Sequence, residues 1–479
     1  MDLAGKQIAV LGAGGSGYAA AALALSRGAS VSVYDSGSSE KLASAVARFS
    51  ELGAPLVCGD SALIPPRHFD LTVISPGIDT VWPIAVAFSA ESDELVGEIE
   101  FAYRLGKAPV IAITGTNGKT TTTSLVTAML NGCGLRAVAA GNIGLAYSEV
   151  VLSGREYDWI VLEVSSFQLE TVSSFSPEVA VWMNFAPDHM DRYRSVDDYF
   201  AAKFRIFGNL SPDALSICKF ECELNLPGPT VTFSAFSQGA DLGYADGVIR
   251  HWKSYRQFPF SSGSLQGKHN AENVMVALAV ADRLGLDWDQ VTASILSFEA
   301  PPHRCEKVAV VNGVTYLNDS KSTNLHSLES ALSGQDEPVI LIAGGKNKGL
   351  DFLELREVAG RMAREVVCIG EIARDIASGW EGVTTCHFAS DVNESVQIAS
   401  RLARDLSGTD FPSVTRERHR RRRAEALAAV EAGRAALKLA PEMAGDDLRR
   451  AADALARVTG SIGVEDILGE VFSTFCIGK

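Results

Sequence analysis

The sequence predicts an α/β protein, and three observations indicate this class. Apolar runs of strand length alternate with helix-length segments through most of the chain. Two of these runs end in glycine-rich turns that lead into a helix, at residues 12–17 and 115–118. A third strand–glycine pattern, ILIAGGKNKGLDF, lies at 340–352. We therefore expect three Rossmann-like or P-loop-type α/β domains, the third truncated, followed by an α-helical tail.

The bulk composition excludes several classes of protein. The 479 residues are 47% hydrophobic and 21% charged, which is typical of a soluble globular protein. A net charge of −15 argues against general binding to nucleic acid or anionic membranes. No apolar run reaches the roughly 18 residues of a membrane span, and the eight cysteines include no C-x-x-C pair. We expect a cytoplasmic protein. The negative charge does not exclude small phosphorylated ligands, which bind through local backbone amides and single lysines.

The charge distribution divides the chain near Gly408. Residues 409–479 hold 12 basic and 11 acidic side chains, whereas the first 408 residues hold 31 and 47. An arginine-rich stretch, TRERHRRRR, begins this last segment, and alanine-rich helical sequence follows it. The sequence therefore predicts a boundary between two unrelated pieces at this point.

The first predicted domain covers residues 1–93. KQIAVLGAGGSGYAAAALALSRGASVSVYD reads as strand, glycine turn, small-residue helix and strand. Gly12, Gly14 and Gly17 form G-x-G-x-x-G directly after the first strand, and Asp35 ends the second. This pattern favours a dinucleotide-binding unit with an acid near a ribose. The alternatives are glycines that serve packing, or a site adapted to another nucleotide, and these residues leave the ligand open.

The second predicted domain covers residues 94–300 and contains a phosphate loop. PVIAITGTNGKTTTTSLVTAMLNGCG reads as a buried strand, a glycine loop and a helix. A strict Walker A motif would have glycine at position 113, where this chain has Ile113. The loop still supplies amides at a helix N-terminus, Lys119 for the phosphates and the Thr120 hydroxyl for Mg²⁺. We expect ATP to bind here.

Polar side chains end the next two predicted strands. YDWIVLEVSSFQLE places Glu163 and Ser165 after an apolar run, and VAVWMNFAPDHMDRY places Asp188 and His189 after another. Ligands of open α/β sheets gather where strand C-termini emerge, so these groups should lie near the phosphate loop. A carboxylate such as that of Glu163 suits Mg²⁺. His189, taken by itself, is more often an ordinary loop histidine.

These motifs together resemble the Mur ligase family. G-T-N-G-K-T, E-V-S-S-F-Q-L, and D-H-M-D-R-Y followed by A-A-K carry the resemblance, which extends from Met1 to about Gly408. It implies an ATP- and Mg²⁺-dependent ligase that adds D-glutamate to a UDP-linked muramoyl-alanine through an acyl phosphate, in peptidoglycan synthesis. It implies catalytic roles for Lys119, Glu163, His189 and Lys203, of which Glu163, His189, Thr120 and a carbamylated Lys203 would hold metal.

The resemblance also implies ligand contacts on all three domains. For ATP these are Gly115, Thr116, Asn117, Gly118, Lys119, Thr120, Thr121, Asn270, Asn273, Arg304 and Asp319. For the UDP-sugar they are Gly14, Gly15, Ser16, Asp35, Gly77, Asn142 and Ser165. For D-glutamate they are Lys321, Thr323 and Lys348. Arg304 and the D-glutamate contacts fall in PPHRCEKV, TYLNDSKSTN and ILIAGGKNKGLDF of the third domain, residues 301–408.

Residues 409–479 depart from that family. A Mur ligase of this type continues with a strand and turn similar to LLSPACASFDQF, which this chain lacks. The segment instead resembles the C-terminal end of the MnmE family of tRNA-modifying GTPases, finishing in F-C-I-G-K with Cys476. We expect ATP and the UDP-sugar to bind, and D-glutamate addition to be weak or absent. The six arginines within 416–423 favour a solvated helix face over an RNA-binding patch.

Several alternatives remain open at this stage. Another Mur-type ligase or a folylpolyglutamate synthase would share the scaffold, although the UDP-type first domain disfavours the folate enzyme. A nicotinamide-binding oxidoreductase would explain the first glycine motif but not Lys119. The tail could act as a fragment of a tRNA-modification GTPase. As partners we expect small-molecule substrates and neither membrane nor nucleic acid, with a monomeric ligase part and a tail that can self-associate.

Overall fold

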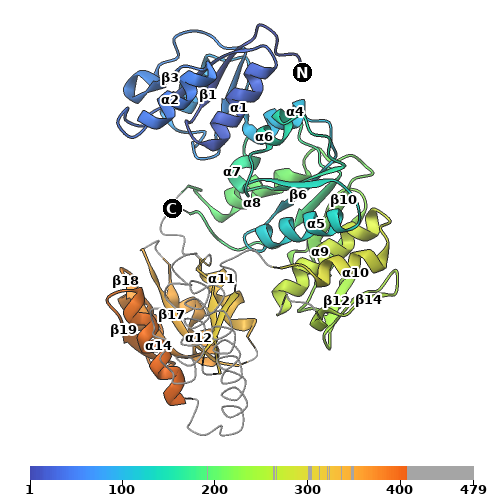
Figure 1. Cartoon of the computed structure of the whole chain (residues 1–479), viewed down its shortest axis with the longest axis vertical. Helices are drawn as coiled ribbons and strands as arrows, with labels where there is room; N and C mark the ends of the chain where they lie inside the picture. Colours follow the sequence, from blue (N-terminus) through green and yellow to red (C-terminus); the bar gives the residue numbers. More distant parts are fainter. Residues whose placement is uncertain are drawn as a thin grey trace, which may run out of the picture. The chain divides into compact units, whose positions relative to one another are not determined.

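A computed structural model describes residues 1–190, 192–262, 265, 267–299, 305–311, 313–320, 322, 324–335, 337–346 and 350–406. The chain divides into two compact units, Met1–Pro301 and Pro302–Lys479 (Figure 1). In both units helices alternate with the strands of the sheets, which confirms the predicted α/β class. The predicted helical tail at 409–479, its Cys476, and the side chains of Arg304, Lys321, Thr323 and Lys348 lie outside the described residues.

The first unit begins with a five-stranded parallel sheet in the order β3-β2-β1-β4-β5. The strand order reverses between β1 and β4, which makes the carboxyl ends of these two strands the expected ligand site. Helix α1 approaches the end of β1 closely at Gly17, since a Cβ atom there would lie only 1.9 Å from the carbonyl oxygen of Gly12. The elements are β1 (Gln7–Leu11), α1 (Gly15–Ser26), β2 (Ser30–Asp35), α2 (Ala43–Leu52), β3 (Leu56–Cys58), β4 (Leu71–Ile74), α3 (Pro83–Ala90) and β5 (Leu95–Gly97).

The same unit continues into a nine-stranded sheet in the order β14-β13-β12-β11-β10-β9-β6-β8-β7. Strands β6 to β12 run parallel to one another. Strand β13 is antiparallel to both of its neighbours, β12 and β14. Strand β6 is fully buried between β8 and β9, so the loops after these three strands emerge side by side. The strands are β6 (Val110–Thr114), β7 (Ala137–Gly141), β8 (Trp159–Glu163), β9 (Val179–Trp182), β10 (Leu215–Lys219), β11 (Thr230–Ser234), β12 (Leu242–Ala245), β13 (Val248–His251) and β14 (Arg256–Phe258).

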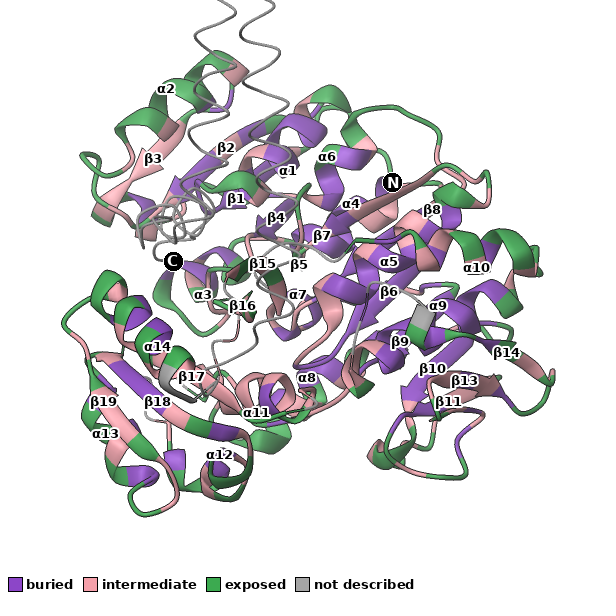
Figure 2. Ribbon diagram, turned by 60° about the horizontal axis from the view of Figure 1, so that its bottom comes forward, coloured by how far each residue is buried: buried purple, intermediate pink, exposed green. Residues whose placement is uncertain are grey.

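Helices cover both faces of this sheet, and the strands between them are largely buried (Figure 2). On one face α5 (Lys119–Gly132), α9 (Lys268–Arg283) and α10 (Trp288–Leu296) form a single apolar core with the strands. The other face carries α4 (Glu98–Leu105), α6 (Tyr147–Leu152), α7 (Ser166–Leu169) and α8 (Val196–Phe204). Helix α4 leads directly from β5 of the first sheet into β6 of the second, so one chain segment joins the two sheets.

The second unit contains a hairpin and a three-stranded parallel sheet. Strands β15 (Glu306–Val311) and β16 (Val314–Asn318) pair antiparallel, and β17 (Val339–Gly345), β18 (Ala363–Gly370) and β19 (Thr385–Phe388) pair in that order. Trp380 is fully buried in its core and donates from Nε1 to the carbonyl oxygen of Phe352 at 2.9 Å. Its helices are α11 (Leu325–Ser333), α12 (Arg356–Met362), α13 (Ala373–Gly379) and α14 (Val392–Leu406).

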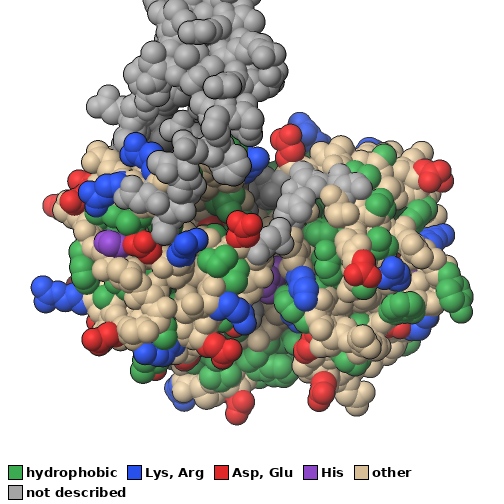
Figure 3. All heavy atoms as spheres, turned by 90° about the horizontal axis from the view of Figure 1, so that it is seen from below, with side chains coloured by type: hydrophobic (Ala, Val, Ile, Leu, Met, Phe, Trp, Pro, Cys, Tyr) green, Lys and Arg blue, Asp and Glu red, His purple; other side chains and the backbone are tan. Residues whose placement is uncertain are grey.

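The described surface carries both signs of charge. Acidic and basic side chains are interspersed on the face shown in Figure 3, which has no continuous basic patch in the part that the structure describes. Among the described helices, none has the length and apolar character needed to cross a bilayer.

Candidate active site

The phosphate loop connects β6 to α5 through two glycines in conformations that other residues rarely adopt. Gly115 has φ 149° and Gly118 has φ 81°. A Cβ atom on Gly115 would lie 2.8 Å from Cβ of Met183, so the loop passes too close to the segment after β9 for any side chain. Helix α5 begins at Lys119, directly after the loop. The arrangement is a ready site for an anion at a helix N-terminus.

Asn184, the second residue after β9, fixes the shape of this loop. Its Oδ1 accepts from the amides of Thr116 at 3.1 Å and Asn117 at 2.9 Å, and its Nδ2 donates to the carbonyl oxygen of Asn117 at 3.1 Å. The Thr116 hydroxyl also donates to the carbonyl oxygen of Ala186 and accepts from its amide, each at 3.0 Å. An anionic ligand would therefore be received chiefly by the amides at the start of α5. Sequence reasoning missed Asn184, whose only signal is its place just after an apolar strand.

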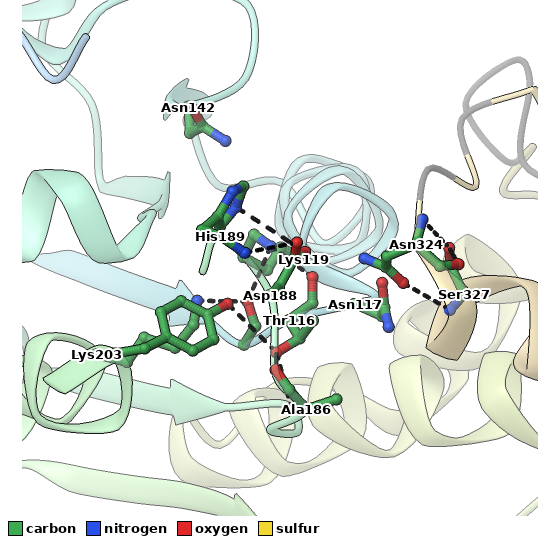
Figure 4. Close-up of polar contacts among 12 residues, drawn as sticks. Thr116, Asn117, Lys119, Asn142, Ala186, Asp188, His189, Lys203, Asn324 and Ser327 are labelled. Atoms are coloured by element: carbon green, nitrogen blue, oxygen red, sulfur yellow. Dashed lines mark hydrogen bonds and ion pairs between the residues drawn. The ribbon is translucent and has the colours of Figure 1, made fainter. Parts of the chain in front are cut away.

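Two predicted catalytic lysines meet at this loop (Figure 4). Lys119 donates from Nζ to the carbonyl oxygens of Gly115 and Thr116, both at 2.9 Å. Lys203, on α8, donates to the same Gly115 oxygen at 2.9 Å and is only 2% exposed. Burial, and then the charge of Lys119, holds the pKa of Lys203 well below the usual lysine value, against the opposing pull of Asp188 and Glu163. The site therefore makes it easier for Lys203 to lose its proton than for an exposed lysine.

Glu163 offers an unpaired carboxylate oxygen beside these lysines. The side chain, at the end of β8, is 3% exposed, and its Oε1 accepts from Nδ2 of Asn142 at 2.9 Å. Its Oε2 is buried and has no hydrogen-bond partner among the described residues. A buried carboxylate oxygen left in this state is costly unless a cation or donor completes it. The residue thus fits a magnesium ligand, as the sequence predicted.

His189 lies on a strained turn after β9. Its φ of 59° is unusual for a residue other than glycine, and its amide donates to Oδ1 of Asp188 at 2.9 Å. The imidazole packs beside Phe167, with ring centroids 4.9 Å apart, and near Tyr199 at 6.1 Å. Backbone strain of this kind is maintained when surrounding contacts define the conformation, and it is frequent at functional sites.

Protein side chains alone do not complete a metal site here. Within the described ranges, which omit Asp191, no group of three or more His, Cys, Asp or Glu side chains is arranged to hold a metal ion. Mg²⁺ takes few protein ligands and usually keeps phosphate and water oxygens. The combination of Glu163, His189 and the Thr120 hydroxyl with nucleotide phosphates is consistent with that chemistry.

The two asparagines expected near ATP lie beside the phosphate loop. Asn273 on α9 accepts from the Thr122 hydroxyl at 3.0 Å and donates to Oδ1 of Asn270 at 3.0 Å. A Cβ atom on Gly118 would come within 2.8 Å of Oδ1 of Asn273. Helix α9 therefore closes one side of the loop, and the structure brings these predicted residues together.

In the first sheet, the glycines of the N-terminal motif have two different roles. Gly12 and Gly17 pack tightly, whereas a Cβ atom on Gly14 or Gly15 would meet no atom within 4 Å. Both oxygens of Asp35 accept backbone amides, from Ala13 at 2.8 Å and from Gly37 at 2.9 Å. Asp35 thus shapes the turn around the open glycines. Ser16 follows them in α1, and Gly77 lies exposed in the loop after β4.

Two further predicted contacts have structural partners. Ser165 caps α7, since its hydroxyl oxygen accepts from the amide of Gln168 at 3.3 Å. Asp319, in the second unit, accepts from the amide of Cys305 at 3.0 Å and from the Ser322 hydroxyl at 2.5 Å. Arg304, Lys321, Thr323 and Lys348 lie outside the described residues.

Comparison with known proteins places the chain in a family. The model of the Mur ligase middle domain matches residues 113–281, and that of the Mur ligase glutamate ligase domain matches residues 303–410. A UDP-N-acetylmuramoylalanine–D-glutamate ligase of Geotalea daltonii is 36% identical over 422 residues, which cover 84% of this chain and 91% of the relative. The chain belongs to the Mur ligase family. The protein of the same name from Syntrophotalea carbinolica is 37% identical over 413 residues, with the same coverage.

Solved structures share the fold of this Mur ligase at lower identity. The UDP-N-acetylmuramate-alanine ligase MurC of Thermotoga maritima aligns with a TM-score of 0.52 and 19% identity over 82% of this chain and 92% of its own. A pseudomurein peptide ligase type C of Methanothermus fervidus gives 0.50 and 19% over 85% and 95%. At this identity the likeness shows the fold alone.

The resemblance of the C-terminus is also confirmed. The model of the MnmE helical domain matches residues 384–476, and it overlaps the glutamate ligase match at 384–410. Within the overlap, α14 packs on the second unit of the Mur ligase: Val396 contacts Val311 and Tyr316, and the Tyr316 hydroxyl hydrogen-bonds the Ser400 hydroxyl at 2.9 Å. This packing assigns α14 to the ligase part of the chain.

Proposed function

We propose that this Mur ligase joins D-glutamate to UDP-N-acetylmuramoyl-L-alanine in the cytoplasm, with cleavage of ATP, as a step of peptidoglycan synthesis. The observation that carries the proposal is the convergence of the Lys119 and Lys203 amines on the carbonyl oxygen of Gly115, at the N-terminus of α5. The names of relatives that match 84% of the chain support the choice of substrates. The matches to the Mur ligase middle and glutamate ligase domains, which include the phosphate loop, disfavour the oxidoreductase alternative.

The reaction begins with transfer of a phosphoryl group. The substrate carboxylate attacks the γ-phosphate of ATP, which forms an acyl phosphate and releases ADP. The amides at the start of α5 and the Lys119 ammonium, which hydrogen-bonds the loop, neutralise charge on the transferring group. The amine of D-glutamate then attacks the acyl carbon, phosphate leaves, and the amine loses a proton as the amide forms.

Mg²⁺ would be held by Glu163, His189, Thr120 and a carbamylated Lys203, and when bound it would neutralise charge on the phosphates. The unpaired Oε2 of Glu163 supports this assignment. The lowered pKa of Lys203 favours the deprotonated amine, which is the form that can add carbon dioxide. A nitrogen–carbon bond forms as one carbon–oxygen π bond of carbon dioxide breaks, the nitrogen loses a proton, and a carbamate carboxylate results. Isotope-labelled carbon dioxide tests this step, since a carbamate signal should appear in the wild type and be absent from Lys203→Arg.

The remaining predicted residues are assigned to ATP, to the UDP-sugar and to D-glutamate. Asn270 and Asn273 would lie near the adenine, with Arg304 and Asp319 completing the ATP site. Asn142, Ser165, Gly77 and the Gly14–Ser16 turn with Asp35 would receive the UDP-sugar. D-glutamate would be bound by Lys321, Thr323 and Lys348.

The proposal is tested by measuring phosphate release with UDP-N-acetylmuramoyl-L-alanine, ATP and Mg²⁺, with and without D-glutamate, and by detecting the amide product. We expect nucleotide and UDP-sugar binding, with slow amide formation because residues 409–479 lack the segment expected around D-glutamate. Absence of both binding and phosphate release would contradict the proposed function. Amide formation as fast as in the relatives would show that the replaced C-terminus is dispensable.

A further inference from the structure

Arg192 connects the loop after β4 in the first sheet with the segment after α7 in the nine-stranded sheet. Its Nη1 donates to the carbonyl oxygen of Pro76 at 3.0 Å, and its Nη2 donates to Oε2 of Glu170 at 2.6 Å. Pro76 belongs to the loop after β4 of the first sheet, and Glu170 follows α7 of the nine-stranded sheet. One guanidinium therefore holds the two sheets together at their ligand-facing loops.

Glu170 holds the turn that carries His189. One of its oxygens pairs with Arg192, and the other, Oε1, accepts from the Tyr193 hydroxyl at 2.6 Å. The backbone amides of Arg192 and Tyr193 both donate to the carbonyl oxygen of His189, at 3.0 and 3.1 Å. The two side chains that Glu170 binds thus belong to the turn that gives His189 its strained conformation.

Phe167 completes this arrangement on the other side of the turn. The guanidinium carbon of Arg192 lies 4.1 Å from the centroid of the Phe167 ring, and the imidazole of His189 lies 4.9 Å from it. The ring is therefore in contact with both residues. A movement of Arg192 would change the packing of the His189 imidazole directly.

Polar groups of Arg192 reach the loop after β4 beside a cavity. A cavity remains between the two sheets, lined among others by Ile74, Ile78, Phe167 and Thr171. Arg192 spans this gap to Pro76, and its Nε lies 3.6 Å from Oδ2 of Asp79. The Arg192 and Glu170 side chains are 13% and 15% exposed, so the pair is shielded from solvent. Ion pairs in such a position fix geometry when both partners are present.

We propose that Arg192 and Glu170 are positioning residues that hold the His189 turn and the loop after β4 in a fixed position relative to each other. They would thereby couple the binding of the UDP-sugar to the binding of metal. The inference rests on the proposed function, because that function assigns His189 to the metal and Gly77 of this loop to the UDP-sugar. Neither Arg192 nor Glu170 needs to touch a ligand.

The test compares Arg192→Lys with Arg104→Lys. Arg104 is a matched control, because its side chain is 19% exposed and pairs with Glu94 and Glu100 where the two sheets meet. Among the described residues, no hydrogen bond joins Arg104 to the His189 turn or to the loop after β4. Lysine keeps the charge but cannot reproduce the planar fork. We expect Arg192→Lys to raise both the Kd for UDP-N-acetylmuramoyl-L-alanine and the Mg²⁺ concentration for half-maximal phosphate release by about 10-fold or more. Arg104→Lys should leave both at the wild-type values.

Glu170→Gln and Tyr193→Phe provide a second, independent pair of variants. Both loosen the His189 turn without removing the Arg192 contact to Pro76, so they should raise the Mg²⁺ requirement more than the Kd for the UDP compound. The Kd is measured by calorimetry without ATP or metal, and the melting temperature of every variant is recorded. If Arg192→Lys and Arg104→Lys lower the melting temperature alike and leave the Kd and the Mg²⁺ requirement unchanged, the positioning role is wrong.

Failure of the proposed function gives a different result from failure of this inference. A wild type that binds the UDP compound but releases no phosphate would contradict the ligase, and the Kd of Arg192→Lys would still decide whether Arg192 sets the loop. Suppose instead that the wild type turns over ATP, and that Arg192→Lys and Glu170→Gln have the wild-type Kd for the UDP compound and the wild-type Mg²⁺ requirement. That result would overturn only the inference about Arg192 and Glu170. A wild type that fails to bind the UDP compound would overturn both.

Discussion

The side-chain amines of Lys119 and Lys203 donate to the same acceptor, the carbonyl oxygen of Gly115, each at 2.9 Å. Two ammonium groups so close together in a shielded place repel each other, which favours loss of a proton from one of them. Burial and the Lys119 charge lower the pKa of Lys203, so Lys203 loses its proton more easily than an exposed lysine does. This arrangement agrees with the proposed roles, in which Lys119 binds phosphate and Lys203 is carbamylated.

The lowered pKa of Lys203 makes its contribution to stability depend on pH. Between the folded pKa and the ordinary lysine value of 10.5, the unfolded chain binds one more proton than the native protein, so stability rises with pH in this window. Lys203→Met removes that dependence. Without carbon dioxide, the variant should exceed the wild type in unfolding free energy by an amount that shrinks as the pH rises toward 10.5. Denaturant titrations at several pH values measure it, and an advantage independent of pH would show that Lys203 is protonated in the fold.

Asn142 should tune the metal affinity of Glu163. Its Nδ2 donates to Oε1 of Glu163 at 2.9 Å and leaves Oε2 for a cation. Removal of such an orienting partner typically costs about 10–100-fold in metal affinity or activity. Asn142→Ala should therefore raise the Mg²⁺ concentration for half-maximal phosphate release by that factor. Asn131→Ala, which removes an amide that bonds only backbone groups at the far end of α5, is the control and should titrate as the wild type does.

The two glycine motifs should respond differently to alanine. Gly115→Ala would bring a Cβ atom within 2.8 Å of Met183 at a φ of 149°, so we expect a loss of about 1–3 kcal/mol in unfolding free energy. Gly14 has φ −77° and open space around the added atom, so Gly14→Ala should fold as the wild type does. Gly14→Ala should nevertheless weaken binding of the UDP compound, if the open turn receives its phosphates. Equal stability losses in the two variants would refute this division of roles.

Much of this site follows from the sequence because strand ends and glycine turns are local signals. Glu163 and His189 were predicted near the phosphate loop from their places after apolar strands, and Asn273 does contact that loop. Asn184 also follows an apolar strand, but its role, like the roles of Glu170 and Arg192, depends on hydrogen-bond partners that lie on other segments of the chain. Even Asp35, predicted to face a ribose, accepts the amide of Ala13 across the turn, a contact that only the folded backbone creates.

The proposed ATP site depends most on Lys119, and Lys119→Ala tests this site directly. The measurement is the rate of phosphate release from ATP with UDP-N-acetylmuramoyl-L-alanine, D-glutamate and Mg²⁺ present, alongside the melting temperature as a check on folding. Removal of a preorganised charge at a transferring phosphoryl group should lower the rate at least about 100-fold while the protein stays folded. A folded variant that releases phosphate at the wild-type rate would contradict the assignment of this loop as the ATP site.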